Sequence, residues 1–151
     1  MKNEKLYRKT VDILLDAYNA GELKHDSCMA CAVGNLVKAG SGFLGDDVYF
    51  PVPMWDRVFY TGYRQNYYPE EYTGRAKIEI DSTGYSLNDL MKIEQNFESA
   101  SALDYTKETQ YYGLCAVLDV LAKIHEANSE ENEVEHTKLE TIYGRLSAQC
   151  V

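Results

Sequence analysis

The residues best suited to chemistry lie in one short segment, His25-Asp26-Ser27-Cys28-Met29-Ala30-Cys31. Cys28 and Cys31 are three residues apart, so on a helix their sulfur atoms would lie on one face, one turn after His25. Zinc prefers four thiolate or imidazole ligands in a tetrahedral array. The segment therefore predicts a candidate zinc site formed by His25, Cys28 and Cys31. The fourth ligand would have to come from the distant half of the chain: Cys115, Cys150, His125 or His136.

Two other interpretations of these cysteines stay open. Free cysteine is among the most buried residue types, and zinc modules usually carry two ligand pairs where this chain has one. The sequence therefore favours plain core thiols over zinc. In the remaining interpretation, Cys28 is a nucleophile activated at a helix N-terminus, with His25, His125 or His136 as its base. Cysteine hydrolases usually place that histidine on a sheet, whereas the spacing after Gln110 is helical.

A second candidate site is an irregular insert, about residues 40–75, that is rich in aromatic residues. It contains ten of the eighteen aromatic residues of the chain, and a loop of this length in a compact domain is often functional. Aromatic rings beside an arginine can stack a base or sugar, or anchor a protein partner. The same rings can instead form a lid over the core, with tyrosine hydroxyls left in water. The predicted contact residues are Trp55, Arg57, Phe59, Tyr60, Tyr63, Tyr67 and Tyr68.

Helical periodicity predicts most of the elements that would position these residues. Apolar residues recur at helical spacing from Leu6 to Tyr18, before a stop at Gly21. Ser86 and Asp89 have the spacing of a capping box at the start of another helix. The other predicted helices run from a cap at Asp26 or Ser27 to near Gly40, from about Thr109 to Ala127, and from Val134 to Leu146 after a polar turn over Asn128–Glu133.

One short segment has the period of a strand. Ala76 to Asp81 alternates apolar and polar residues, which predicts a half-buried strand, and Val48–Phe50 would pair with it. The predicted fold is mainly α. It is a single domain over residues 1–151, with a compact bundle of four to five helices, a small two-stranded β excursion and the irregular insert.

The charge of the chain restricts its partners. The formal net charge of −9 disfavours nucleic acid and membrane surfaces, which select basic proteins. No stretch approaches the ~18 apolar residues of a membrane span, and the N-terminus lacks the apolar core of a signal peptide. We therefore expect a cytoplasmic protein with reduced thiols and no cofactor other than the zinc considered above.

Three segments carry a resemblance to a known group of proteins. Residues Leu23–Asn35, Ile80–Ser86 and Leu90–Glu94 resemble small proteins encoded by gut Bacteroidota and their phages, a family with no assigned activity. The resemblance covers most of the chain, from the first helix to the helix that contains His125. It implies an accessory role, such as binding a host or phage component or a small molecule, in the host cytoplasm if the protein is phage-encoded.

These observations lead to three hypotheses about function. The leading hypothesis is a non-enzymatic interaction protein that uses the aromatic insert, which predicts an exposed apolar patch around Trp55 and Tyr60. The second is a small-molecule or nucleotide-binding protein with a closed pocket lined by the same aromatic residues. The third is a zinc- or thiol-dependent protein centred on Cys28 and Cys31. The sequence leaves the identity of the partner and the oligomeric state open.

Overall fold

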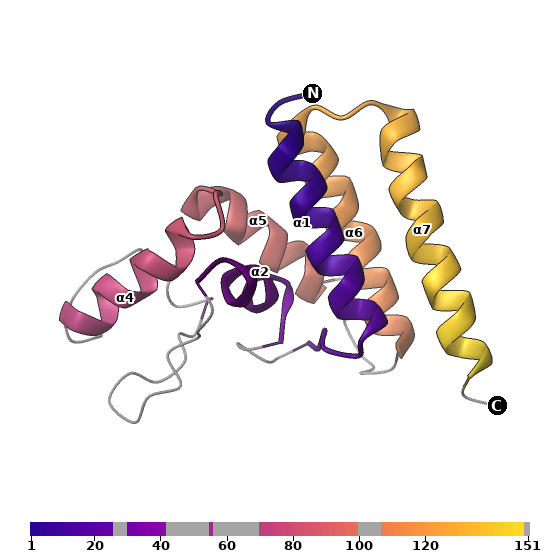
Figure 1. Ribbon diagram of the computed structural model, residues 1–151, viewed down its shortest axis with the longest axis horizontal. Helices are drawn as coiled ribbons and strands as arrows, with labels where there is room; N and C mark the ends of the chain where they lie inside the picture. Colours follow the sequence, from indigo (N-terminus) through magenta and orange to yellow (C-terminus); the bar gives the residue numbers. More distant parts are fainter. Residues whose placement is uncertain (26–29, 42–54, 56–69, 100–106, 150–151) are drawn as a thin grey trace.

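The computed structural model describes residues 1–25, 30–41, 55, 70–99 and 107–149, and these residues form an all-helical structure (Figure 1). The prediction of a mainly α fold is confirmed at this level. None of the helices in the described ranges is long and apolar enough to cross a membrane. The described ranges contain six helices, where the sequence predicts four to five: α1 (Glu4–Asn19), α2 (Ala32–Ser41), α4 (Glu70–Asp81), α5 (Leu87–Ser99), α6 (Lys107–His125) and α7 (Ser129–Ala148).

Helix α6 is the centre of the arrangement. It packs against α5, α7 and α1, and α1 in turn contacts α2 and α7. In Figure 1, α1 and α6 run side by side with α7 at the outer edge, while α2, α4 and α5 lie on the opposite side. The two groups are joined by the packing of α5 against α6 and by the contact of α2 with α1.

The apolar spacing of the sequence explains why the central helices pack in this way. Helix α6 buries Leu114, Val117, Leu118 and Leu121, which share one face because they are three, four and seven residues apart. The predicted helix from Leu6 to Tyr18 is confirmed as α1. Its chain turns at Gly21, whose φ of +73° lies in the left-handed region that favours glycine.

The start of α5 agrees with the sequence prediction, whereas α7 begins earlier than predicted. Ser86 Oγ accepts the N–H of Asp89 at 3.1 Å, so Ser86 caps α5 as predicted. The predicted polar turn over Asn128–Glu133 is wrong beyond its first residue. Asn128 is the cap of α7, and its Oδ1 accepts the N–H of Glu131 at 2.8 Å. Acidic residues in the first turn of a helix suit its positive end.

The predicted strand over Ala76–Asp81 is also wrong, because this segment is the last part of α4. Ala76, Glu79 and Ile80 are buried, and their spacing of three and four residues places them on one face of a helix. A strand would bury Ile78 on the same face as Ala76 and Ile80, but Ile78 is 62% exposed. A segment of six residues is too short to distinguish the two-residue period of a strand from the 3.6-residue period of a helix. The proposed partner strand, Val48–Phe50, lies outside the described residues.

Hydrogen bonds tie the N-terminal segment to the end of α6. The Lys2 N–H donates to the His125 carbonyl at 2.6 Å, and His125 Nδ1 donates to the Lys2 carbonyl at 2.7 Å. The Tyr85 hydroxyl donates to Thr10 Oγ1 at 2.8 Å and lies 2.7 Å from His125 Nε2. All three side chains are buried. One hydroxyl from the start of α5 therefore links α1 to α6.

Replacing this hydroxyl should destabilise the protein. We expect Tyr85→Phe to lower the free energy of unfolding by about 1–2 kcal/mol, because Thr10 and His125 would each lose a buried hydrogen-bond partner. Urea denaturation followed by circular dichroism measures the change. Tyr112→Phe is the matched control, because Tyr112 is 57% exposed and its hydroxyl can bond to water. Equal stability of the two variants would contradict a structural role for the Tyr85 hydroxyl.

Candidate functional site

The structure describes two of the three predicted zinc ligands, His25 and Cys31, whereas Cys28 lies outside the described residues. His25 is buried, and its ring stacks on Phe97 of α5 with 4.0 Å between ring centroids. Its Nε2 lies 2.9 Å from the Phe97 carbonyl oxygen, to which it donates. Gly113 of α6 leaves room for this pair, because a Cβ there would lie 3.0 Å from His25 Nε2. His25 is thus packed between α5 and α6.

Cys31 is the N-cap residue of α2. It lies immediately before the first helical residue, Ala32, and so is outside the helix. The Gly34 N–H donates to Cys31 Sγ at 3.2 Å, and the Asn35 N–H donates to the Cys31 carbonyl at 3.0 Å. The prediction that Cys31 lies within the helix is therefore wrong, because α2 begins one residue later, at Ala32. The predicted caps, Asp26 and Ser27, lie outside the described residues. Cys31 is 1% exposed and belongs to the core.

A glutamate from another helix completes this cap. Glu94 of α5 is buried, and its Oε2 accepts the N–H of Val33 at 3.3 Å. The Glu94 carboxyl is also hydrogen-bonded to the Cys31 thiol. Glu94 is not among the predicted site residues, although the sequence contains a signal for it. Glu94 follows Leu90 by four residues and precedes Phe97 by three, so it is a carboxyl on the apolar face of its helix.

The surroundings of the Cys31–Glu94 pair keep both groups neutral. Burial, together with the nearby Glu98, raises the pKa of Glu94 to about 8, against the opposing effect of the contacts with Cys31 and the Val33 N–H. Burial, with Glu94 adding to it, also raises the pKa of the Cys31 thiol well above its ordinary value. Metal binding and nucleophilic attack both need a thiolate. Cys31 therefore has the properties of a core thiol.

The zinc hypothesis gains no support from the described part of the chain. Within the ranges the structure describes, no group of three or more His, Cys, Asp or Glu side chains is placed to hold a metal ion. The full set of His25, Cys28 and Cys31 stays a prediction, because the position of Cys28 is not described.

Both ends of the predicted irregular insert are helical, because α2 runs to Ser41 and α4 begins at Glu70. Among the predicted contact residues of the insert, the structure describes only Trp55. Its side chain is 2% exposed and belongs to the core cluster. At Trp55 the predicted exposed patch is therefore wrong, because the indole fills the interior as the lid interpretation requires. The other predicted contact residues lie outside the described ranges, and their role stays a prediction: Arg57, Phe59, Tyr60, Tyr63, Tyr67 and Tyr68.

A set of accessible polar side chains lies where α6 meets α7. Asp119 Oδ1 accepts hydrogen bonds from Asn132 Nδ2 at 3.0 Å and from His136 Nε2 at 2.8 Å. Partial burial alone would raise the pKa of Asp119, but the hydrogen bonds from Asn132 and His136 outweigh it and hold this pKa below its ordinary value. Asp119 therefore keeps its negative charge at neutral pH. Its side chain is 56% exposed, so a partner can reach it.

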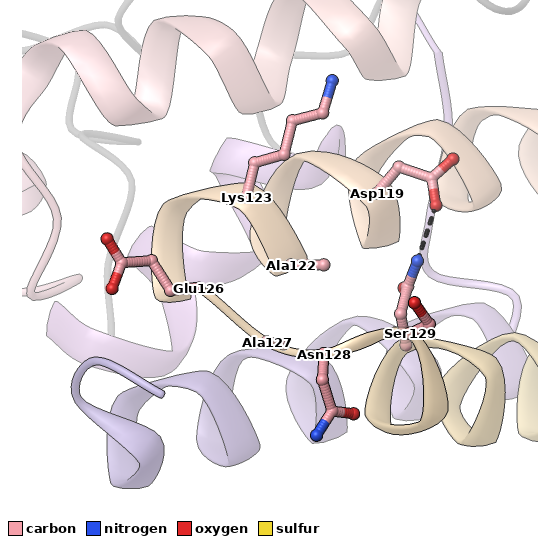
Figure 2. Close-up of a pocket in the computed structure, with 8 residues that line it drawn as sticks. Asp119, Ala122, Lys123, Glu126, Ala127, Asn128 and Ser129 are labelled. Atoms are coloured by element: carbon pink, nitrogen blue, oxygen red, sulfur yellow. Dashed lines mark hydrogen bonds between the residues drawn. The ribbon is translucent and has the colours of Figure 1, made fainter.

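An open pocket adjoins Asp119 at the turn between the two helices. Its volume is about 430 Å³, and it is lined by Asp119, Lys123 and Glu126 of the α6 side together with residues at the start of α7. Figure 2 shows these three side chains projecting from the α6 side, with a dashed hydrogen bond joining Asp119 to α7. A small organic ligand is usually enclosed in a mainly apolar cavity. This open, charged pocket differs from that arrangement.

Tyrosines flank the other end of the same helix pair. The Tyr111 ring stacks on Tyr143 of α7 with 4.4 Å between centroids, and Tyr112 lies edge-on to Tyr111 at 5.4 Å. Burial, followed by Cys115 and Glu140, raises the pKa of Tyr111 to about 12, so its hydroxyl stays neutral. Tyr112 precedes Asp119 by seven residues and so lies on the same face of α6. We call the set Tyr111, Tyr112, Asp119, His136, Glu140 and Tyr143 the α6–α7 seam.

Little in the sequence indicates the seam. Nothing in the local pattern marks Asp119, and the sequence predicts His136 only as a distant zinc ligand or base. The two residues are 17 positions apart on different helices, so only the pairing of α6 with α7 brings them together. Comparison with protein-family models, with curated proteins and with solved structures finds no match to this chain.

The raised pKa of Glu94 predicts that stability falls with rising pH. Below about pH 4.5 the carboxyl is neutral in both the folded and unfolded chains. Between about pH 4.5 and 8 the unfolded chain ionises while the folded chain does not, which favours unfolding. We expect Glu94→Gln to remove this contribution and to raise the unfolding free energy at pH 8 by on the order of 2 kcal/mol.

Urea denaturation at pH 5 and pH 8 measures this difference. Glu130→Gln is the matched control, because Glu130 is exposed and has the same charge. A loss of stability in Glu94→Gln at pH 8 would show that the carboxyl is ionised and stabilising, contrary to this account.

Proposed function

We propose that this protein is a non-enzymatic interaction protein that binds a basic segment of a protein partner along the α6–α7 seam. The observation that carries the proposal is the pairing of an exposed tyrosine with a persistent negative charge on one face of α6. Tyr112 is 57% exposed, and Asp119 keeps its carboxylate through two hydrogen bonds from α7. Both lie on regular helices, which hold them in fixed positions before a partner arrives.

The tyrosines provide apolar contact area and a preference for cations. The Tyr111 ring is held in place by stacking on Tyr143. It also makes an edge-to-face contact with the more exposed ring of Tyr112. A guanidinium or ammonium group is attracted to the face of such a ring. Tyrosine is also enriched among the residues that contribute most to binding energy at protein interfaces. The seam can therefore hold an arginine or lysine side chain against an aromatic surface.

The carboxylates of the seam select the same kind of partner. Asp119 lies near the middle of the helix pair, and Glu140 is an exposed residue of α7 close enough to affect Tyr111. The chain as a whole carries a net charge of −9, which would steer a basic partner toward it. Charge complementarity therefore argues for a segment rich in arginine or lysine.

The alternatives have weaker support from the described residues. A thiol-dependent activity at Cys31 would need a thiolate, and burial keeps that thiol neutral. A small-molecule binder would need an enclosed apolar site, and the pocket beside Asp119 is open and charged.

A peptide probe tests the proposal. We expect a short fluorescein-labelled peptide that alternates arginine with alanine to bind the protein, and its glutamate counterpart not to bind. Fluorescence anisotropy at low and moderate salt measures both. Tyr112→Ala should weaken binding by about tenfold, the loss typical of a residue that contributes strongly to an interface. Glu140→Gln should weaken it less, and mainly at low salt, because rim charges are screened.

Asp12→Asn is the matched control for charge, since Asp12 is exposed on α1. This variant loses the same charge as Glu140→Gln and should bind as the unmodified protein does. If Asp12→Asn and Glu140→Gln weaken binding equally, the attraction comes from the net charge and not from the seam. Absence of binding to the arginine peptide at low salt would contradict the proposed function.

A further inference from the structure

The start of α2 is closed by a side chain from a different helix. The first N–H groups of a helix have no partner within that helix and must be satisfied by other groups. Cys31 Sγ accepts the Gly34 N–H, and Glu94 of α5 accepts the Val33 N–H. Residues 33 and 94 are 61 positions apart, so this contact ties two distant parts of the chain together. Its chemistry differs from an ordinary serine or aspartate cap, because both capping side chains are buried and titratable.

The groups around Glu94 disfavour its charge. From the start of α2 it faces the Cys31 thiol, and from α5 itself it faces Glu98, one turn further along. His25, from the segment before α2, packs on the neighbouring Phe97 and directs Nε2 to a backbone carbonyl. Helix α6 meets that turn of α5 with Gly113. Among the described residues, no Lys, Arg or His side chain is bonded to Glu94.

We propose that Glu94 is a proton-operated latch: its neutral carboxyl holds the start of α2 closed over the Cys31 thiol, and its ionisation opens this contact and exposes the thiol. The proton leaves to solvent, and no covalent bond changes. A neutral carboxyl can accept the Val33 N–H with one oxygen and donate its proton from the other. An ionised carboxyl would be a buried charge without a cation, beside the carboxylate of Glu98.

The balance of these effects places the opening close to physiological pH. An ionised cap would gain from the positive end of α2, but burial and Glu98 outweigh this gain. The pKa of Glu94 is accordingly raised to about 8, so a small change in pH shifts the proportion of closed and open latch. The latch is independent of the α6–α7 seam, and either proposal can fail without the other.

Alkylation of Cys31 tests the latch. The reagent is iodoacetamide, applied to the full chain in a Cys28→Ser background, with mass spectrometry of the peptide that contains Cys31. We compare the unmodified Glu94 with Glu94→Gln, which imitates the neutral carboxyl. Between about pH 6.5 and 9, the ratio of the two Cys31 rates should rise about tenfold, as expected for a group titrating within this range. Both chains are measured at the same pH, and because Glu94 raises the pKa of Cys31, any remaining difference in thiol ionisation lowers this ratio and works against the expected rise.

Two further measurements keep the test decisive. Cys115 lies in α6 and is half-buried, so its alkylation rate should be the same in both chains. Hydrogen exchange on the unmodified protein, corrected for base catalysis, should show the Val33 and Gly34 amides losing protection as the pH rises toward about 8 and levelling off above it, while Leu118 keeps its protection. A constant ratio of Cys31 rates across this range, or unchanged protection of the Val33 amide, would overturn the latch.

Discussion

Burial of α6 is the constraint on which the other features of this protein depend. The apolar side chains of α6, such as Leu114 and Leu121, must be shielded from water, and α5 and α1 pack against α6 to do this. Helix α7 also packs against α6, but its fully buried side chains are Glu135 and Leu139. Glu135 bonds to Arg8 at 3.2 Å and to Lys138 at 3.3 Å, which ties α7 to α1. The contact of α6 with α7 is also partly polar, because Asp119 accepts hydrogen bonds from Asn132 and His136, and it leaves Asp119 and Tyr112 accessible.

Two carboxyl groups show how the same chemistry serves different purposes in this fold. Asp119 is accessible and accepts two side-chain hydrogen bonds, so its charge is stabilised and available to a partner. Glu94 is buried beside a thiol and another glutamate, so its neutral form is favoured. The first arrangement supports recognition of a basic partner. The second makes the α2–α5 contact depend on a single proton.

The sequence predicted the features that local spacing determines. The apolar period of α1 and the serine cap of α5 depend on residues within a few positions of each other, and both predictions were confirmed. The segment Ala76–Asp81 was assigned to a strand because six alternating residues fit either period, and only packing decides between them. Asn128 was placed in a turn, although asparagine followed by acidic residues also fits the start of a helix.

The candidate sites were harder to predict because their residues come from different helices. Glu94 meets Cys31 only once α5 packs on α2, and Asp119 meets His136 only once α7 folds back on α6. Composition favoured the aromatic insert as a surface, but an indole fits the core as well as an interface, and Trp55 is in the core. A glutamate on an apolar helix face is a signal that the sequence contains for Glu94, but Glu79 and Glu135 are also buried, so this signal alone does not single out the Cys31 contact.

The central claim is that the α6–α7 seam is the surface that binds a basic partner. The most direct measurement is a nuclear magnetic resonance titration of the isotope-labelled protein with the arginine–alanine peptide. The account predicts that the largest backbone shift changes fall on Tyr112, Asp119, His136 and Tyr143, and that buried residues of α2 such as Val33 change little. Shift changes concentrated in the aromatic insert, or spread evenly over all acidic residues, would contradict it.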